Sequence, residues 1–219
     1  MRTSDATIHN RRWTGPLHRT AAILAAAILP AAILAAGPRA RPESRPAKTA
    51  EQPPSRWESA IRAFEESDAV AQPPQGGILF IGSSSIRLWD VSRWFPGRPT
   101  IQRGFGGSQV ADSVRYTERI LLPYRPKVVV VYAGDNDVAA GKSPEEVLAD
   151  FNQFVAKVHA ALPQTRIVYI SIKPSVKRWS LVDKIRQANQ LIREATENDP
   201  RLAFLDVDAP MLGPDGQPR

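Results

Sequence analysis

The sequence contains no cysteine, so disulfides, thiolate metal sites, a cysteine nucleophile and a cysteine-linked lipid anchor are excluded. A chain without cysteine is compatible with any redox compartment. Histidine is also scarce, because only three occur among 219 residues, and His159 is the one that follows residue 56. The length suffices for one ordinary α/β domain with extensions.

Positive and negative charges nearly balance over most of the chain. The formal net charge is +7, but residues 57–219 contain 20 Lys and Arg against 19 Asp and Glu. The excess of positive charge therefore belongs to the first 56 residues. A nucleic-acid partner requires a basic surface on the folded part, so we expect none.

The first 36 residues have the form of an export signal. Arg11, Arg12 and Arg19 precede the apolar stretch 21–36, which Pro30 interrupts. A membrane-spanning helix needs ~20 continuous apolar residues, so we predict a cleavable signal and a periplasmic or extracellular protein. The alternative is an uncleaved N-terminal anchor, which would be the chain's one membrane contact.

Residues 37–56 are rich in proline and charge, which predicts a semi-extended linker. The folded domain is predicted to span residues 57–219. There, apolar runs alternate with segments of helical spacing. The predicted strands are 77–82, 99–105, 127–134, 166–172 and 201–207, and the predicted helices are 57–70, 85–95, 108–124, 143–163 and 180–198. This alternation indicates an α/β fold with a parallel sheet between helical layers.

Polar clusters follow the first three predicted strands. They read GSSS at 82–85, GFGGS at 104–108 and GDND at 134–137. In parallel sheets the functional site lies beyond the carboxyl ends of the strands, so the clusters should meet. Each also has a plain structural explanation: a serine helix cap, a tight glycine turn and a capped turn.

Each cluster has a chemical use as well. A serine at a strand-to-helix turn exposes its hydroxyl where helical N–H groups favour developing negative charge, as acyl transfer requires. Glycines allow close approach of the backbone to a ligand, and an asparagine amide can donate to an oxyanion.

Taken together and in this order, FIGSSSI, QRGFGGS and AGDND resemble the SGNH hydrolases, also called the GDSL-type esterase/lipase family. The resemblance runs from about residue 77 to residue 219. It implies a flavodoxin-like, three-layer α/β/α fold with a five-stranded sheet of order 2-1-3-4-5. It also implies ester hydrolysis with Ser84 as nucleophile and an oxyanion hole formed by the N–H groups of Ser84 and Gly107 and the side chain of Asn136.

The chain departs from the family pattern at several positions. Ser83 and Ser108 stand where the family often has aspartate, and Gln102 replaces an asparagine. The family's base is a histidine in an Asp-x-x-His motif after the fifth strand. No such histidine or aspartate occurs in this chain, and His159 lies within a predicted helix.

Two explanations remain open for the missing base. The sequence is a fragment, which we favour, or it is a complete but inactive relative. A fold of this type needs a last helix, without which apolar surface around the first and fifth strands would face water. Each apolar side chain buried is worth ~1.5–3 kcal/mol, against a total stability of ~5–15 kcal/mol.

The sequence therefore predicts an exported serine ester hydrolase, acyl esterase-like or lysophospholipase-like, that is inactive or very weak as it stands. Its substrate would be a small-molecule ester, an acyl-sugar or a lysolipid. The first alternative is a non-catalytic acyl- or sugar-binding protein. A less favoured one is a Mg²⁺-dependent phosphoryl enzyme using Asp135, Asp137 and Asp206.

No cofactor or metal is implied by the leading hypothesis. Trp89, Trp94 and Trp179 could line a substrate site, but their helical spacing favours a packing role. Substrate identity and oligomeric state cannot be predicted from these residues.

Overall fold

The computed structural model describes residues 56–219. The predicted export signal or anchor at 1–36, and all of the predicted linker except Arg56, lie outside the described residues. Within residues 56–219, no helix is both long and apolar enough to cross a membrane.

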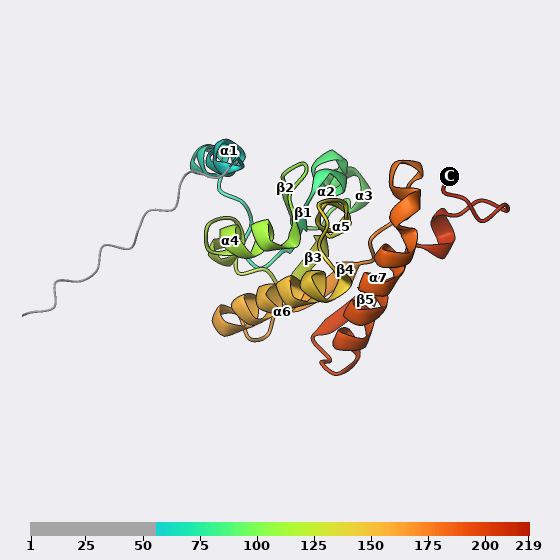
Figure 1. Ribbon diagram of the computed structural model, residues 1–219. Coiled ribbons are helices and arrows are strands. Elements are labelled where there is room, and N and C mark those ends of the chain that lie inside the picture. The colour runs from blue at the N-terminus through green and yellow to red at the C-terminus, as the bar shows by residue number, and fades with distance from the viewer. Residues whose placement is uncertain (1–55) are drawn as a thin grey trace, which may run out of the picture. The chain divides into compact units, whose positions relative to one another are not determined.

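A five-stranded, entirely parallel sheet forms the centre of the fold (Figure 1). Its strands are β1 (Ile78–Gly82), β2 (Thr100–Gly104), β3 (Val128–Tyr132), β4 (Arg166–Ile170) and β5 (Leu202–Leu205). Their order across the sheet is β2-β1-β3-β4-β5, which confirms the expected α/β fold. This order places β1 between β2 and β3, so the three polar clusters lie at the carboxyl ends of three adjacent strands.

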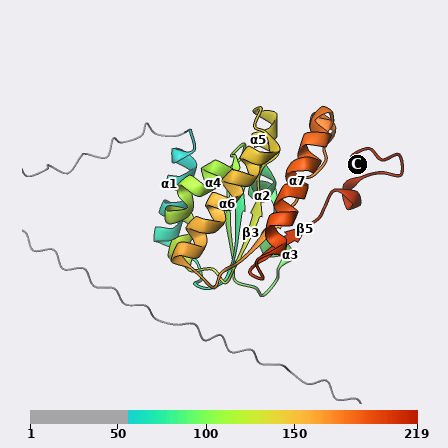
Figure 2. The same cartoon turned by 60° about the horizontal axis from the view of Figure 1, so that its bottom comes forward.

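Helices cover the two faces unequally (Figure 2). The α-helices are α1 (Glu58–Val70), α2 (Ser84–Leu88), α3 (Val91–Trp94), α4 (Val110–Ile120), α5 (Asp135–Ala139), α6 (Pro144–Ala161) and α7 (Val182–Glu197). Short 3-10 turns are η1 (Leu122–Tyr124), η2 (Val176–Leu181) and η3 (Ala209–Met211). Residues of α1, α4, α6 and α7 pack with one face of the sheet into the main core, and α2 and α3 form a smaller core on the other face.

The start of α6 shows how local sequence sets an element. The Ser143 hydroxyl accepts a hydrogen bond from the Glu146 N–H at 3.2 Å, and the Glu146 carboxylate accepts one from the Ser143 N–H at 2.7 Å. Pro144 occupies the first helical position, where its missing N–H costs nothing. The predicted start of this helix is confirmed.

The single helix predicted at 85–95 is wrong, because the chain forms α2 and α3 with a break at Trp89 and Asp90. The side-chain amide of Gln102, on β2, donates to the carbonyl oxygens of Ile86 and Trp89 and so ends α2. The Asp90 carboxylate then accepts the Arg93 N–H at 3.1 Å and starts α3. A tertiary contact therefore overrides the helical spacing.

The face carrying α2 and α3 is covered at one end only. At β1, Phe80 is 1% exposed beneath Ile86 and Val91, so the expectation of open apolar surface around the first strand is wrong. At the other end Leu205 of β5 is 51% exposed. The fifth strand therefore does present apolar surface to solvent.

Candidate active site

The sheet brings the three predicted site residues to one edge. Gly82, Gly104 and Tyr132 are register partners that end β1, β2 and β3. Ser84 and Asn136 follow these partners by two and four residues, and the Gly107 turn follows by three. Since adjacent strands lie ~4.8 Å apart, the turns carrying these residues flank one another.

The turn between β1 and α2 selects Ser84 from the three consecutive serines. Gly82 has φ +140°, and a Cβ there would lie 1.9 Å from the Tyr132 carbonyl oxygen, so only glycine fits. Ser83 is fully buried, and Ser85 is not among the residues that line the cleft beside this turn. Ser84 is the first residue of α2, is half-buried and lines a cleft.

Gly107 lies in a tight turn in which the Ser108 N–H donates to the Phe105 carbonyl at 3.3 Å. Its φ of +81° requires glycine, and a Cβ would approach the Trp57 ring to 3.2 Å. The Arg56 guanidinium donates to the Gly107 carbonyl at 3.0 Å. None of the hydrogen bonds among residues 56–219 engages the Gly107 N–H, which leaves it available to a ligand.

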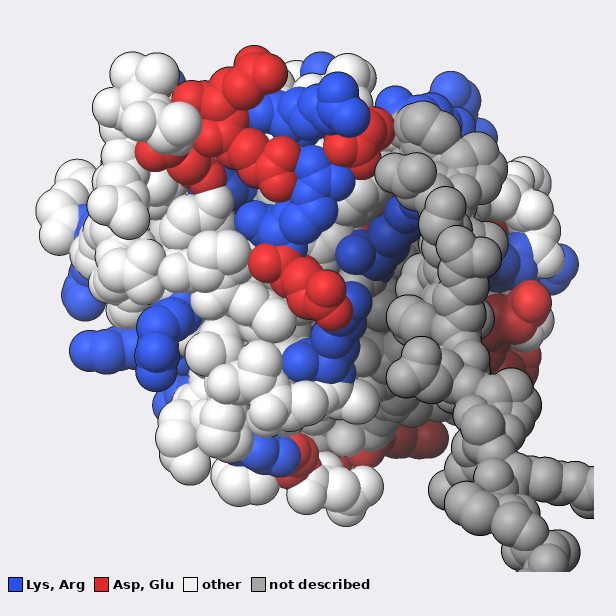
Figure 3. Space-filling model, turned by 90° about the vertical axis from the view of Figure 1, so that its left-hand side faces the viewer, with Lys and Arg blue, Asp and Glu red and all other residues white. Residues whose placement is uncertain are grey.

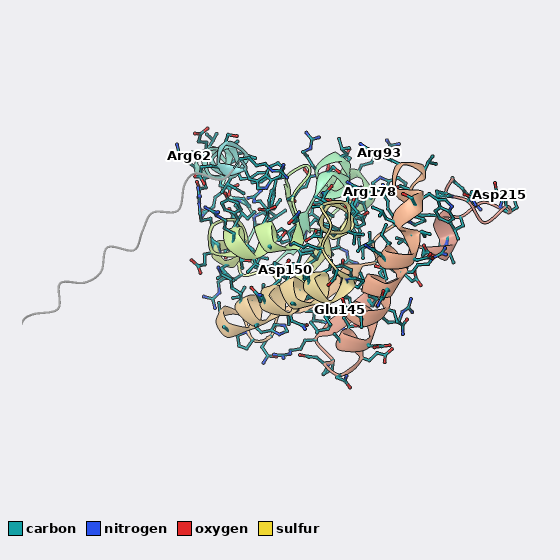
Figure 4. The ribbon with its side chains drawn as sticks, in the orientation of Figure 1. Arg62, Arg93, Glu145, Asp150, Arg178 and Asp215 are labelled. Carbon is teal, nitrogen blue, oxygen red and sulfur yellow. The ribbon has the colours of Figure 1, made fainter. Side chains whose placement is uncertain are left out.

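Asn136 on α5 is held at both ends of its side-chain amide. Nδ2 donates to the Ser108 carbonyl at 2.9 Å, and Oδ1 accepts from Nη2 of Arg178 at 2.7 Å. The other guanidinium nitrogen of Arg178, Nη1, donates to the Asp135 carboxylate. Arg178 reaches this position from η2, which follows β4 (Figure 4).

Asp137 has a structural role in this geometry. Its fully buried carboxylate accepts the Val110 N–H at the start of α4 and the Lys142 ammonium at 3.0 Å. Lys142 also donates to Asp150 at 2.6 Å. Burial raises the pKa of Asp137, and Lys142 opposes that effect.

The cleft beside Ser84 has a volume of about 600 Å³. It lies between α1, α2 and the turn after β2, and no acidic residue contributes to its described lining. The lining residues are Arg56, Trp57, Ser59, Ala60, Ala63, Phe64, Ser84, Arg87, Gln102, Gly104, Phe105, Gly106 and Gly107. The contribution of the start of α1 to this cleft was not predicted, because the sequence around Trp57 indicates only where the folded domain begins.

The three tryptophans singled out from the sequence lie outside this lining. Trp89 packs against Phe80, with ring centroids 5.3 Å apart, and Trp94 is exposed. The guanidinium of Arg186 lies 5.7 Å from the Trp179 ring. Each of the three tryptophans is therefore a packing or surface residue and does not line the cleft.

His159 lies at the opposite edge of the sheet. Its Nε2 is 3.0 Å from the carbonyl oxygen of Thr165, which directly precedes β4. Because it is the one histidine within residues 56–219, this part of the chain places no histidine at the carboxyl edge near Ser84.

The three aspartates of the magnesium hypothesis do not meet. Asp135 and Asp137 already bind Arg178 and Lys142, and Asp206 follows β5, with β4 between it and the others. Residues 56–219 contain no group of three or more His, Cys, Asp or Glu side chains arranged to hold a metal ion. The geometry gives the magnesium hypothesis no support.

Comparisons with known proteins show which chains this one resembles. Platelet-activating factor acetylhydrolase IB subunit alpha1 of Homo sapiens is 31% identical over 182 residues, which cover 80% of this chain and 77% of the relative. The alpha2 subunit of Gallus gallus is 27% identical over 167 residues, covering 74% and 71%. The solved structure of a GDSL-like lipase from Bacteroides thetaiotaomicron has a TM-score of 0.59 at 17% identity, covering 72% of this chain and 82% of that one.

Residues 87–219 match the family model described as the GDSL-like Lipase/Acylhydrolase family. The matched segment begins three residues after Ser84 and contains Gly107 and Asn136. The chain belongs to the GDSL-like lipase/acylhydrolase family.

Proposed function

We propose that this chain is a serine ester hydrolase in which Ser84 attacks the carbonyl carbon of a small acyl ester. The observation that carries the proposal is the placement of Ser84 in a cleft just after the central one of three adjacent strands, with Gly107 and Asn136 after the two flanking strands. A nucleophile flanked by fixed hydrogen-bond donors is the arrangement that acyl transfer needs.

In the proposed reaction, the Ser84 Oγ forms a bond to the acyl carbon and gives its proton to a base. The carbonyl oxygen takes up the electron pair and accepts hydrogen bonds from the N–H groups of Ser84 and Gly107 and from Asn136 Nδ2. Collapse of this intermediate expels the alcohol, and water then cleaves the acyl-enzyme. Each oxyanion donor contributes by stabilising charge that develops in the transition state.

The base is the missing part of this proposal. A serine hydroxyl is a weak nucleophile without one, and residues 56–219 place no histidine near Ser84. Oxyanion stabilisation and binding alone leave ~10³–10⁴-fold catalysis over water in triad enzymes. We therefore expect slow hydrolysis that added imidazole accelerates.

For the substrate, we propose an acetyl or similarly short acyl ester, with acyl-sugars and lysolipids as further classes to test. The support is the 31% identical relative, which is named an acetylhydrolase. The cleft adds two arginines and the Trp57 and Phe64 rings beside Ser84, without an acidic lining residue.

We also propose that the protein is exported, on the basis of the signal-like segment 1–36. Cell fractionation with an antibody against the folded domain tests this directly. A signal is expected in the periplasm or medium, or in membranes if the anchor is uncleaved. A cytoplasmic pool alone would contradict the proposal.

The experiment for the reaction compares the wild type with Ser84→Ala and Ser85→Ala, using 4-nitrophenyl acetate with and without imidazole. Ser85 is the matched control, since it is adjacent to Ser84 but does not line the cleft. We expect Ser84→Ala to lose the activity and the imidazole response, and Ser85→Ala to retain both. Equal rates in all three proteins would overturn the nucleophile assignment.

A second candidate function is non-catalytic binding of acyl or sugar ligands. The observation that favours it is the placement of His159 at the far edge of the sheet. It predicts that acetylated sugars or lysolipids bind equally to the wild type and Ser84→Ala, as measured by calorimetry, and are not hydrolysed by either protein.

A further inference from the structure

The guanidinium of Arg178 joins two consecutive residues at the end of β3. Nη2 donates to the Asn136 side-chain oxygen at 2.7 Å, while Nη1 donates to the Asp135 carboxylate. Arg178 itself follows β4, so this contact crosses from one strand end to the next. Its side chain is partly buried, with 22% of its surface exposed.

The contacts of Asn136 determine which way its amide faces. A guanidinium carries donors only, so the amide oxygen must face Arg178. The Ser108 carbonyl is an acceptor only, so the amide nitrogen must face Ser108, as the 2.9 Å contact shows. A flipped amide would lose both hydrogen bonds and oppose like groups at both ends.

The amide nitrogen carries two hydrogens, and Ser108 takes one of them. The second remains for a ligand oxygen at the carboxyl edge of β1. Arg178 also withdraws electron density from the amide oxygen, which makes the N–H groups better donors. Its hydrogen bond therefore affects both the orientation and the polarity of the amide.

Asp135 keeps Arg178 in this position. Its side chain is 12% exposed, and its Oδ2 accepts from Nη1 of Arg178, which is its cationic partner among residues 56–219. The planar, forked guanidinium can reach Asp135 and Asn136 together. A lysine offers a single point charge on a flexible stem and cannot reproduce that fork.

We propose that Arg178 is a positioning residue that fixes the Asn136 amide with its N–H directed at the substrate oxyanion. This inference rests on the proposed ester hydrolysis. Arg178 acts through Asn136 and not on the reacting atoms. Its loss should therefore reduce transition-state stabilisation more than substrate binding.

The kinetic test measures kcat and KM for 4-nitrophenyl acetate in the wild type, Arg178→Ala and Arg178→Lys. We expect kcat to fall about 10- to 100-fold in Arg178→Ala with KM changed by less than about 3-fold, since removal of an oxyanion donor itself costs ~10²–10³. Millimolar guanidinium chloride should restore part of the Arg178→Ala rate. Arg178→Lys should regain less than guanidinium does.

The matched control is Arg201→Ala, which removes another Arg–Asp ion pair, with Asp199, before β5. It should leave kcat unchanged. In an Asn136→Ala background, Arg178→Ala should cause no further loss of kcat, because its effect passes through that amide. Full additivity of the two losses, or a wild-type kcat in Arg178→Ala, would overturn the inference.

A second readout does not require turnover. The side-chain NH₂ signals of Asn136 can be assigned in ¹H–¹⁵N spectra by their disappearance in Asn136→Ala. They should shift and exchange faster with water in Arg178→Ala but not in Arg201→Ala. Unchanged signals in Arg178→Ala would refute the positioning role, whereas equal rates for the wild type and Ser84→Ala would refute only the proposed reaction.

Discussion

The side-chain nitrogen of Asn136 lies 2.9 Å from the carbonyl oxygen of Ser108. This hydrogen bond joins the turn after β3 to the turn after β2, over the end of β1, which lies between them. Gly107 directly precedes Ser108, so the two proposed oxyanion donors that come from outside the Ser84 turn are held to each other. A change at position 136 should therefore disturb both donors.

Asn136→Asp tests this link. The aspartate retains an acceptor for Arg178 but loses the donor and sets an anion against the Ser108 carbonyl. We expect the rate of acetyl ester hydrolysis to fall ~10²–10³-fold, the usual cost of losing an oxyanion donor. Asn198→Asp, an exposed change at the end of α7, is the control. A rate for Asn136→Asp within about 3-fold of the wild type would exclude Asn136 from the oxyanion hole.

Gly107→Ala should destabilise the protein more than Gly97→Ala. Both glycines have positive φ, at +81° and +72°, so alanine costs roughly 1–2 kcal/mol at either site. A Cβ at 107 also meets the Trp57 ring at 3.2 Å, whereas nothing lies within 4 Å of one at 97. Urea unfolding measures the two free energies.

The excess cost of Gly107→Ala should shrink in a Trp57→Ala background, because the ring is then absent. If the excess persists there, the contact with Trp57 is not its cause. Gly107→Ala should also slow ester hydrolysis, since the alanine changes the turn that presents the N–H of residue 107.

The parts of the fold that could be predicted are those with local signals. Ser143, Pro144 and Glu146 predict the start of α6, and their contacts confirm it. The apolar runs predict five strands in the right places. The sheet order came from the resemblance, and that order is what places Gly107 and Asn136 on either side of Ser84.

The parts that could not be predicted depend on contacts between distant residues. Gln102 ends α2 from β2, although the spacing around Trp89 favours a continuous helix. Arg178 reaches Asn136 from 42 residues further along the chain, and Trp57, just before α1, lines the same cleft as Gly107. No short-range pattern marks such pairs, so neither Arg178 nor Trp57 could be assigned to the site.

Acid should weaken the attachment of α1 to α4. Acidic and basic side chains lie next to one another on the side of the molecule that Figure 3 shows. Arg119 on α4 donates to Glu58 at 2.9 Å and to Glu65 at 2.7 Å. These hydrogen bonds lower the pKa of both carboxyls from the ordinary value of 4.5. The folded state then binds fewer protons than the unfolded state, so their contribution is present above pH 4.5 and lost as pH falls through the lowered folded values.

The measurement is the free energy of unfolding in urea from pH 7 to pH 3 for the wild type and Arg119→Met. The wild-type advantage should be constant above about pH 5 and shrink below 4.5. Arg62→Met, which removes only a mostly exposed pair with Glu58, is the control and should show a smaller pH-dependent difference. An Arg119 effect that stays constant to pH 3 would contradict the assignment.

The open end of the second sheet face should bind a hydrophobic dye. Leu205 is 51% exposed. Val168 and Ala203, which pair with each other on the same face, are also only half-buried. Exposed contiguous apolar surface marks sites of binding or aggregation. We expect anilinonaphthalene sulfonate fluorescence with the native chain. Leu205→Glu should reduce it, while Val70→Glu, an isolated exposed site on α1, should not. Equal fluorescence in Leu205→Glu and the wild type would mean that the dye binds elsewhere.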